Sequence, residues 1–147
     1  MTENKLKFEI IWKDDHMFEM EIFADNGRYS GTIEVYESSS QLMDFANELS
    51  RFPFEKETIT NSYGEADSES YFKMDFYKVS PAGKCGVKIT MEEDVTTEHK
   101  NVVKDSLIME LIIEPNAIDE FYKELKFLSV KEKGSAELKA ISKYAGI

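Results

Sequence analysis

Two histidines and one cysteine are the residues best suited to act as a nucleophile, a general base or a soft metal ligand. His16 and His99 are far apart along the chain, and neither has a second histidine at i+4 or a neighbouring CxxC pair. Cys85 follows a lysine, which favours a thiolate, yet a lone cysteine in a strand pattern is more typical of a small buried side chain. These spacings predict neither a nucleophile–base pair nor a metal centre.

Carboxylates are the other groups that could do chemistry. Aspartate and glutamate make up 29 of the 147 residues, so close pairs are unavoidable and their spacing is not specific. The acidic run from Glu92 to His99 lacks the alternating oxygen ligands and the glycine of a calcium loop, and is typical of a solvated charged segment. The sequence has no GxSxG, Walker or GxGxxG motif. We therefore predict a protein that is not an enzyme and that uses no cofactor.

The charge balance limits the classes of partner. With 18 basic and 29 acidic residues the net charge is −11, which repels nucleic acid and anionic lipid and favours a basic protein partner. No apolar run approaches the roughly 20 residues of a membrane span, and the first residues do not have the pattern of a signal peptide. A single cysteine excludes an intrachain disulfide and fits a reducing compartment. We expect a cytoplasmic protein with no membrane or nucleic-acid partner.

Alternation of apolar and polar residues predicts the strands that must position these side chains. In the first strand it places Leu6, Phe8, Ile10 and Trp12 on one face. The segments between the strands include two polar loops, at 61–70 and 93–105, and a short further strand at 57–61 is left open. The predicted strands cover residues 5–13, 17–24, 29–37, 71–79, 84–92 and 106–114.

Apolar residues at helical spacing predict two long helices, over 42–52 and 116–128. The spacing of Leu138 and Ile141 predicts a short third helix after Ser135. Strands followed by helices, without β-α-β alternation, are typical of an α+β fold. We expect an antiparallel sheet of about six strands, with the two main helices on one face and the short helix at the C-terminal end.

The chain is expected to form a single domain, 1–147, and its two halves have similar patterns. Phe45 and Phe121 occupy matching positions in the segments 5–53 and 71–129. The match is consistent with a duplicated βββα unit, and equally with two units that share only their apolar spacing. Residues 130–147 then form a C-terminal extension.

The strand alternation also gathers carboxylates and large apolar side chains on the face opposite the helices. Aromatic anchors surrounded by charge suit a tight interface, because charge speeds the encounter and buried rings hold the complex. We predict that this face binds another protein, and the alternative is that residues 130–147 or a second copy of the chain covers it. The candidate residues are Glu9, Glu19, Glu21, Phe23, Glu34, Tyr36 and Tyr77.

Three stretches carry a resemblance to a known group. They are a strand, cap and helix that end in Phe-Pro (32–37 and 42–53), the long hairpin 71–91, and the closing strand and helix 107–128. This layout resembles the small immunity proteins encoded beside bacterial polymorphic toxins, notably the WapI-like group and related domains of unknown function. The resemblance implies stoichiometric binding and inhibition of a cognate toxin, which could be a basic toxin domain, and it supplies no catalytic residues.

Two other functions remain open from the residues alone. One is a small-molecule-binding or enzymatic domain with a cleft near the loops 61–70 and 93–105. The other is a homodimeric interaction module that closes its own open sheet face.

Overall fold

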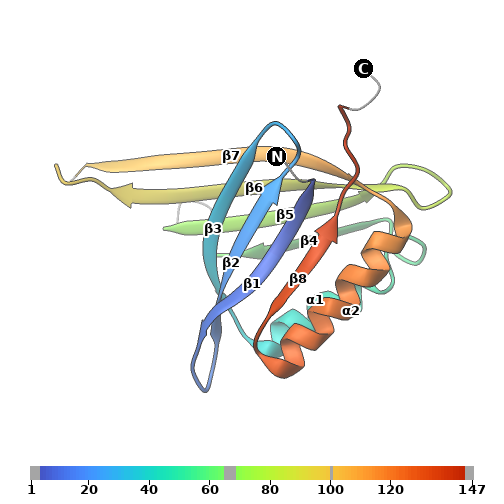
Figure 1. The fold of residues 1–147 in the computed structure, drawn as a ribbon, viewed down its shortest axis with the longest axis horizontal. Helices are drawn as coiled ribbons and strands as arrows, with labels where there is room; N and C mark the ends of the chain where they lie inside the picture. Colours follow the sequence, from blue (N-terminus) through green and yellow to red (C-terminus); the bar gives the residue numbers. More distant parts are fainter. Residues whose placement is uncertain (1–3, 65–68, 100, 145–147) are drawn as a thin grey trace.

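The computed structural model describes residues 4–64, 69–99 and 101–144 as two antiparallel four-stranded sheets with two helices (Figure 1). The α+β class is confirmed, but the predicted single sheet of about six strands is wrong. Sheet A has the strand order β3-β2-β1-β8 and sheet B the order β4-β5-β6-β7. The elements are β1 Lys5–Lys13, β2 Phe18–Asp25, β3 Ser30–Glu37, α1 Ser39–Leu49, β4 Thr58–Tyr63, β5 Ser70–Lys78, β6 Cys85–Thr96, β7 Val102–Ile113, α2 Pro115–Lys131 and β8 Ser135–Lys139.

The order of elements is the same in the two halves of the chain. Each half has three strands, a helix and a further strand, and the last strand of each half joins the sheet of the other half. Thus β4 follows α1 and pairs with β5, whereas β8 follows α2 and pairs with β1. This exchange explains why the alternating pattern alone did not separate the strands into two sheets. Whether the halves arose by duplication stays a prediction.

One apolar core joins both sheets and both helices. The ring of Phe8 in β1 makes edge-to-face contacts with Phe72 of sheet B at 6.2 Å and with Phe121 of α2 at 5.6 Å between centroids. On the other helix, Phe45 lies 6.1 Å from Phe76 of sheet B. The helices also pack against each other, and α2 contacts β8 while α1 contacts β4. The expectation that both helices lie on one face of a single sheet is therefore wrong, because two sheets offer two apolar faces.

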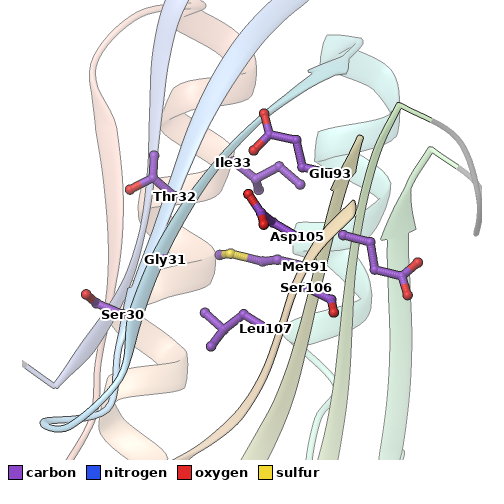
Figure 2. A pocket seen from close by; sticks show the side chains of 10 residues that line it. Ser30, Gly31, Thr32, Ile33, Met91, Glu93, Asp105, Ser106 and Leu107 are labelled. Atoms are coloured by element: carbon purple, nitrogen blue, oxygen red, sulfur yellow. The ribbon is translucent and has the colours of Figure 1, made fainter. Parts of the chain in front are cut away.

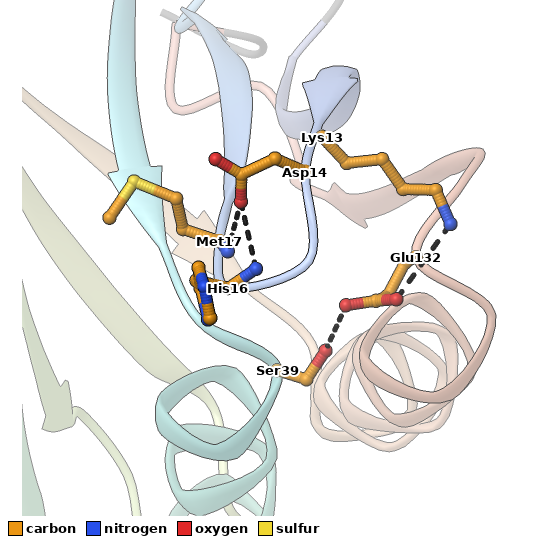
Figure 3. Close-up of polar contacts among 6 residues, drawn as sticks. All are labelled: Lys13, Asp14, His16, Met17, Ser39 and Glu132. Atoms are coloured by element: carbon orange, nitrogen blue, oxygen red, sulfur yellow. Dashed lines mark hydrogen bonds and ion pairs between the residues drawn. The ribbon is translucent and has the colours of Figure 1, made fainter.

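A polar junction ties the start of α1 to the end of α2 (Figure 3). The Ser39 hydroxyl donates to Oε1 of Glu132 at 2.9 Å, and the Ser129 hydroxyl donates to the carbonyl of Ser39 at 2.6 Å. Glu132 caps α2 in the left-handed region, with φ 55°, and its other oxygen lies 3.8 Å from the ammonium of Lys13. The junction fixes the helix pair against the end of β1.

The C-terminal segment is a strand and not the predicted short helix. Ala136 and Leu138 are fully buried on the inner side of β8, and Leu138 lies opposite Leu6 of β1. Their period of two decides the conformation, whereas the spacing of Leu138 and Ile141 had indicated a helix. Because β8 extends the edge of sheet A, residues 130–144 do not cover its outer face. Residues 145–147 lie outside the described part.

The predicted loop at 93–105 is also wrong, since β6 and β7 continue as a paired hairpin as far as Thr96 opposite Val102. The amide of Thr97 donates to the carbonyl of Asn101 at 2.8 Å and closes the turn. In Figure 1 this hairpin projects beyond sheet A. The short strand at 57–61 that was left open is present as β4. Within the described ranges, no helix has the length and apolar character needed to cross a membrane.

Candidate functional site

A row of three carboxylates crosses the outer face of sheet A. Glu34 of β3 lies opposite Glu21 of β2, which lies opposite Glu9 of β1. Like charges at directly opposite positions destabilise a sheet, by about 0.2–1 kcal/mol for each pair. The outer face of sheet A thus places like charges at neighbouring positions across three strands, and the ion pair of Glu9 with Lys7 offsets part of their repulsion. Six of the seven predicted partner-binding residues lie on this face: Glu9, Glu19, Glu21, Phe23, Glu34 and Tyr36.

A second row adds an aromatic residue that the sequence pattern missed. Alternation had placed Trp12 on the inner face, but a shift of register between Ile10 and Trp12 turns its side chain outward, opposite Glu19. Trp12 and Tyr36 are 49% and 57% exposed, and their rings meet edge to face at 6.5 Å. The charge of Glu19 raises the pKa of Tyr36 above its usual value. Two large exposed rings therefore flank the acidic row.

The opposite end of the outer face is basic. Lys7 lies opposite Phe23 and forms an ion pair of 3.7 Å with Glu9. The ammonium of Lys5 lies 5.9 Å from the centre of the Phe23 ring, which is half-buried. Phe23 therefore belongs to a lysine-rich end of the face, away from Trp12. Trp12, Glu19 and Tyr36 lie at the other end of this face, beyond the row of carboxylates.

Tyr77, the seventh predicted residue, is on the other sheet. It lies on the outer face of sheet B, where its hydroxyl donates to Oε1 of Glu110 at 2.5 Å. Its ring covers Gly86, since a Cβ at that position would collide with the ring carbons of Tyr77. Burial, together with the hydrogen bond to Glu110, raises the pKa of Tyr77 to about 12. The prediction that Tyr77 shares the face of Glu9 assumed a single sheet, and it is wrong.

A hollow of about 520 Å³ adjoins the acidic end of the face. Its wall on sheet A is formed by Glu19, Glu34 and Tyr36, and its wall on sheet B includes Glu69 and Glu93. Gly64 and Ser70 also line it, so residues from both predicted loop regions meet here. The hollow lies between the two sheets, near the two loop regions where the sequence had suggested a cleft. Residues 65–68 of the first loop region lie outside the described residues.

A second hollow, of about 390 Å³, lies between β3 and the β6–β7 hairpin (Figure 2). Glu93 and Asp105 are opposite each other on the hairpin, and both carboxylates project into the space beside β3. The floor of the hollow is apolar. At Gly31 an added Cβ would lie 2.6 Å from Cδ2 of Leu107 and 3.2 Å from the sulfur of Met91, so β3 rests directly on the hairpin.

A third hollow, of about 340 Å³, lies at the end of β3 near α1 and contains a buried carboxylate. Glu37 is only 6% exposed, and burial raises its pKa to about 7 although the amide of Ser38 donates to Oε1 at 3.0 Å. Tyr63 is beside it and accepts a hydrogen bond from Nδ2 of Asn61 at 3.1 Å. Burial raises the pKa of Tyr63 as well. The described residues that line these three hollows include no lysine, arginine or histidine.

The residues considered first for chemistry are dispersed. His16 is in the β1–β2 turn, where its amide donates to Asp14, and His99 is in the exposed β6–β7 turn, 3.7 Å from Glu98 (Figure 3 for His16). Cys85 is fully buried, as the sequence indicated, and burial raises the pKa of its thiol to about 12. Among the described residues, no group of three or more histidine, cysteine or acidic side chains could hold a metal ion. No family model matches the chain, and no curated protein or solved structure matches it either.

Proposed function

We propose that the protein is a non-catalytic binding protein that holds a basic protein partner on the outer face of sheet A. The observation that carries this proposal is the like-charge row of Glu9, Glu21 and Glu34. Repulsion within the row lowers the stability of the free protein, and lysine or arginine side chains from a partner would relieve it. The repulsion among these carboxylates would then account both for the stability lost in the free protein and for the free energy gained on binding.

The aromatic pair gives such an interface its anchor. Trp12 and Tyr36 expose large rings beside the carboxylates, and tryptophan and tyrosine are among the residues that contribute most to binding energy when a partner buries them. The carboxylates would accelerate the encounter by long-range attraction, which salt weakens. Association is therefore expected to be fast and dependent on ionic strength.

Within this proposal we favour a bacterial immunity role, because the order of strand and helix patterns in the sequence resembles that of small immunity proteins. A toxin domain that acts on an anionic substrate such as nucleic acid presents a basic surface, and an acidic binding protein can occlude that surface stoichiometrically. A single, fully buried cysteine suits a reducing compartment, so a cytoplasmic location is part of the proposal.

Charge reversal at three positions tests the proposal. The partner to assay is the polypeptide encoded by the reading frame beside this gene, and the variant is Glu19→Lys/Glu21→Lys/Glu34→Lys. We expect its association rate at low salt to fall about tenfold or more, because attraction becomes repulsion. The matched control, Glu55→Lys/Asp119→Lys/Glu120→Lys, changes the net charge equally on the helical side of the molecule and should keep most of the rate.

An equal loss of rate in both variants would show that net charge matters and that the outer face of sheet A does not. Unchanged rates in the first variant, with its fold preserved by circular dichroism, would overturn the proposal.

A homodimeric module is the second candidate, because the β6–β7 hairpin exposes apolar side chains. Val95 and Val103, opposite each other, are 42% and 44% exposed, and Ile108 is 63% exposed. Light scattering after size-exclusion chromatography distinguishes the candidates. A dimer that Val95→Ser/Val103→Ser converts to a monomer would favour this second function.

A further inference from the structure

The outer edge of β3 is not hydrogen-bonded to another described strand, although β3 also packs against β4, β5 and β6 of sheet B. In the part of the chain that the structure describes, β3 pairs with β2 on one side and with no strand on the other. The edge strands β8 and β4 contact α2 and α1. The fourth edge strand, β7, is bridged on its outer side at Ile112 by Ile141. An uncovered edge strand carries unpaired N–H and C=O groups and is a ready template for another strand.

The register identifies which backbone groups face outward from this edge. The amide of Asn26 donates to the carbonyl of Tyr29 at 3.1 Å and closes the β2–β3 hairpin. Because hydrogen-bonded and non-hydrogen-bonded pairs alternate in an antiparallel ladder, Gly31 and Ile33 use their backbone groups to bind β2. The backbone N–H and C=O groups of the alternate residues face the open edge. These residues are Ser30, Thr32, Glu34 and Tyr36.

The three hollows follow this edge from end to end. Tyr36 and Gly64 line both the first and the third hollow, and Glu93 lines both the first and the second. The eight residues of β3 span about 26 Å, which is room for an extended segment of similar length. The walls are acidic throughout, so the segment that fits is basic.

The β6–β7 hairpin provides the floor on which such a segment would lie. The inner side of the hairpin continues the apolar face of sheet B and then presents Glu93 opposite Asp105, followed by Val95 opposite Val103. Two carboxylates at directly opposite positions repel each other, as in the row on sheet A. Beyond them, the two valines form an exposed apolar step.

We infer that an extended, lysine- or arginine-rich segment of the protein partner binds along β3 and becomes a fifth strand of sheet A; this rests on the proposed function. Main-chain hydrogen bonds to Thr32 and Glu34 provide affinity, and alternate side chains provide specificity. On the outer face a basic side chain of the segment lies opposite Glu34. On the inner side another basic side chain meets Glu93 and Asp105, with apolar neighbours over the valines.

A second copy of the chain fits this edge poorly. Antiparallel pairing of β3 with the β3 of another copy would place one acidic edge beside another, and the carboxylates that line the hollows would face their equivalents. The same charge excludes an acidic segment. A basic segment can form the backbone hydrogen bonds of an added strand, and its charge is also complementary to the acidic walls of the hollows.

The test uses the full-length protein and a synthetic peptide, acetyl-Lys-Val-Lys-Lys-Lys-Val-Lys-amide. Titration calorimetry measures its affinity, and hydrogen exchange by NMR measures protection of the β3 amides. We expect binding, with increased protection at Thr32 and Glu34 and none gained at Ile33, whose amide already bonds to β2. A peptide of the same sequence with alternate backbone nitrogens methylated keeps its charge but cannot form the ladder, and should bind about tenfold more weakly or worse.

The protein side is tested with Thr32→Pro, which removes an outward-facing N–H without breaking the ladder to β2, and with Thr32→Ala as its control. We expect the peptide affinity to fall about tenfold in the first variant and to remain in the second. Equal binding of the methylated and unmethylated peptides, or no gain of protection in β3, would overturn the strand addition. If strand addition fails but the association rate of the full partner still depends on Glu19, Glu21 and Glu34, the proposed function stands without strand addition. If that rate does not depend on these three residues, the proposed function itself is overturned.

Discussion

The outer faces of the two sheets each carry a row of charged side chains, and the two rows arrange their charges in opposite ways. Across sheet B, Asp75 lies opposite Lys88, and Lys88 lies opposite Glu110. Thr60 completes that row and donates to Asp75 at 2.8 Å. Across sheet A the equivalent row is acidic from Glu34 to Glu9. Within these two rows, cross-strand charges therefore support sheet B and oppose sheet A.

The outer face of sheet B needs only to be solvated, whereas the outer face of sheet A is suited to bind a partner. In a row of alternating charges, each side chain has a partner of opposite charge on the neighbouring strand. In a row of like charges these partners are missing, and charged groups of another protein can supply them. The aromatic residues follow the same division. Tyr77 on sheet B is engaged by Glu110 and by Gly86, while Trp12 and Tyr36 on sheet A remain half exposed or more.

The largest expected effect is the loss of the core that supports both faces. Phe121→Ala removes a fully buried ring that contacts Phe8 of sheet A, and we expect the free energy of unfolding to fall by about 3–5 kcal/mol. Phe127→Ala is the matched control on the same helix, since Phe127 is 58% exposed, and should cost less than about 0.5 kcal/mol. Urea titration measures both values. A loss below about 1 kcal/mol for Phe121→Ala would show that the helix does not share the core of the sheets.

The second effect concerns the carboxylate on the inner side of β3. Burial raises the pKa of Glu37 to about 7 in the folded protein, above the value of roughly 4.3 of an unfolded glutamate. The folded state therefore holds the proton more tightly. The contribution of protonated Glu37 to folding stability is complete below the pKa that this group has in the unfolded chain. It is lost as the pH rises through about 7.

Relative to Glu37→Gln, the wild-type protein should lose about 1–2 kcal/mol of stability between about pH 5 and pH 8. The glutamine can still accept from the Ser38 amide, so the variant keeps this contact. Urea titrations at the two pH values give the difference. Parallel curves for the two proteins would assign the dependence to other groups.

A third prediction tests the comparison of the two faces directly. Glu21→Gln removes the central charge of the acidic row and should stabilise the protein by about 0.5 kcal/mol. Lys88→Gln removes the central charge of the alternating row and should destabilise it by a similar amount. Added salt should reduce both differences. Changes of the same sign in the two variants would remove the contrast between the faces.

The smallest expected effects are at the histidines. His16 and His99 lie in exposed hairpin turns, away from both charge rows, and His99 lies 3.7 Å from the exposed carboxylate of Glu98. Replacing either residue by alanine should change stability by less than about 0.5 kcal/mol and leave partner binding intact. Loss of function in either variant, with the fold preserved, would reopen a catalytic interpretation.

Local patterns were sufficient to predict six of the strands and both helices, but they missed the extension of the β6–β7 hairpin through 93–105 and did not show how the elements assemble. The alternation in 5–13 and the stripe containing Phe45 depend on neighbouring residues, which the sequence displays directly. The division into two sheets depends on which strands pair, and the fourth strand of sheet A is β8, whose pairing with β1 joins residues far apart in the chain. No local period encodes that pairing, so the number of sheets and the position of Tyr77 were wrong.

The candidate site was predicted in part for the same reason. Six residues of sheet A share a face because strict alternation holds through β2 and β3, and through β1 as far as Ile10. Trp12 was missed because a bulge inserts one residue after Ile10, and nothing in the sequence marks its position. A lone tryptophan next to the polar turn at Asp14 was the available signal, since an exposed tryptophan is uncommon without a role in binding.

The route of the chain also sets the order in which the two sheets can form during synthesis. Strands β4 to β7 are consecutive, so sheet B can fold as a meander while translation continues. Sheet A has to wait for β8, which leaves the ribosome after its other three strands, and until then the edge of β1 is bare. The high contact order of the β1–β8 pairing makes this closing step slow compared with the local hairpins. A nascent chain stalled before residue 135 would therefore expose the apolar side of β1 to chaperones and to aggregation.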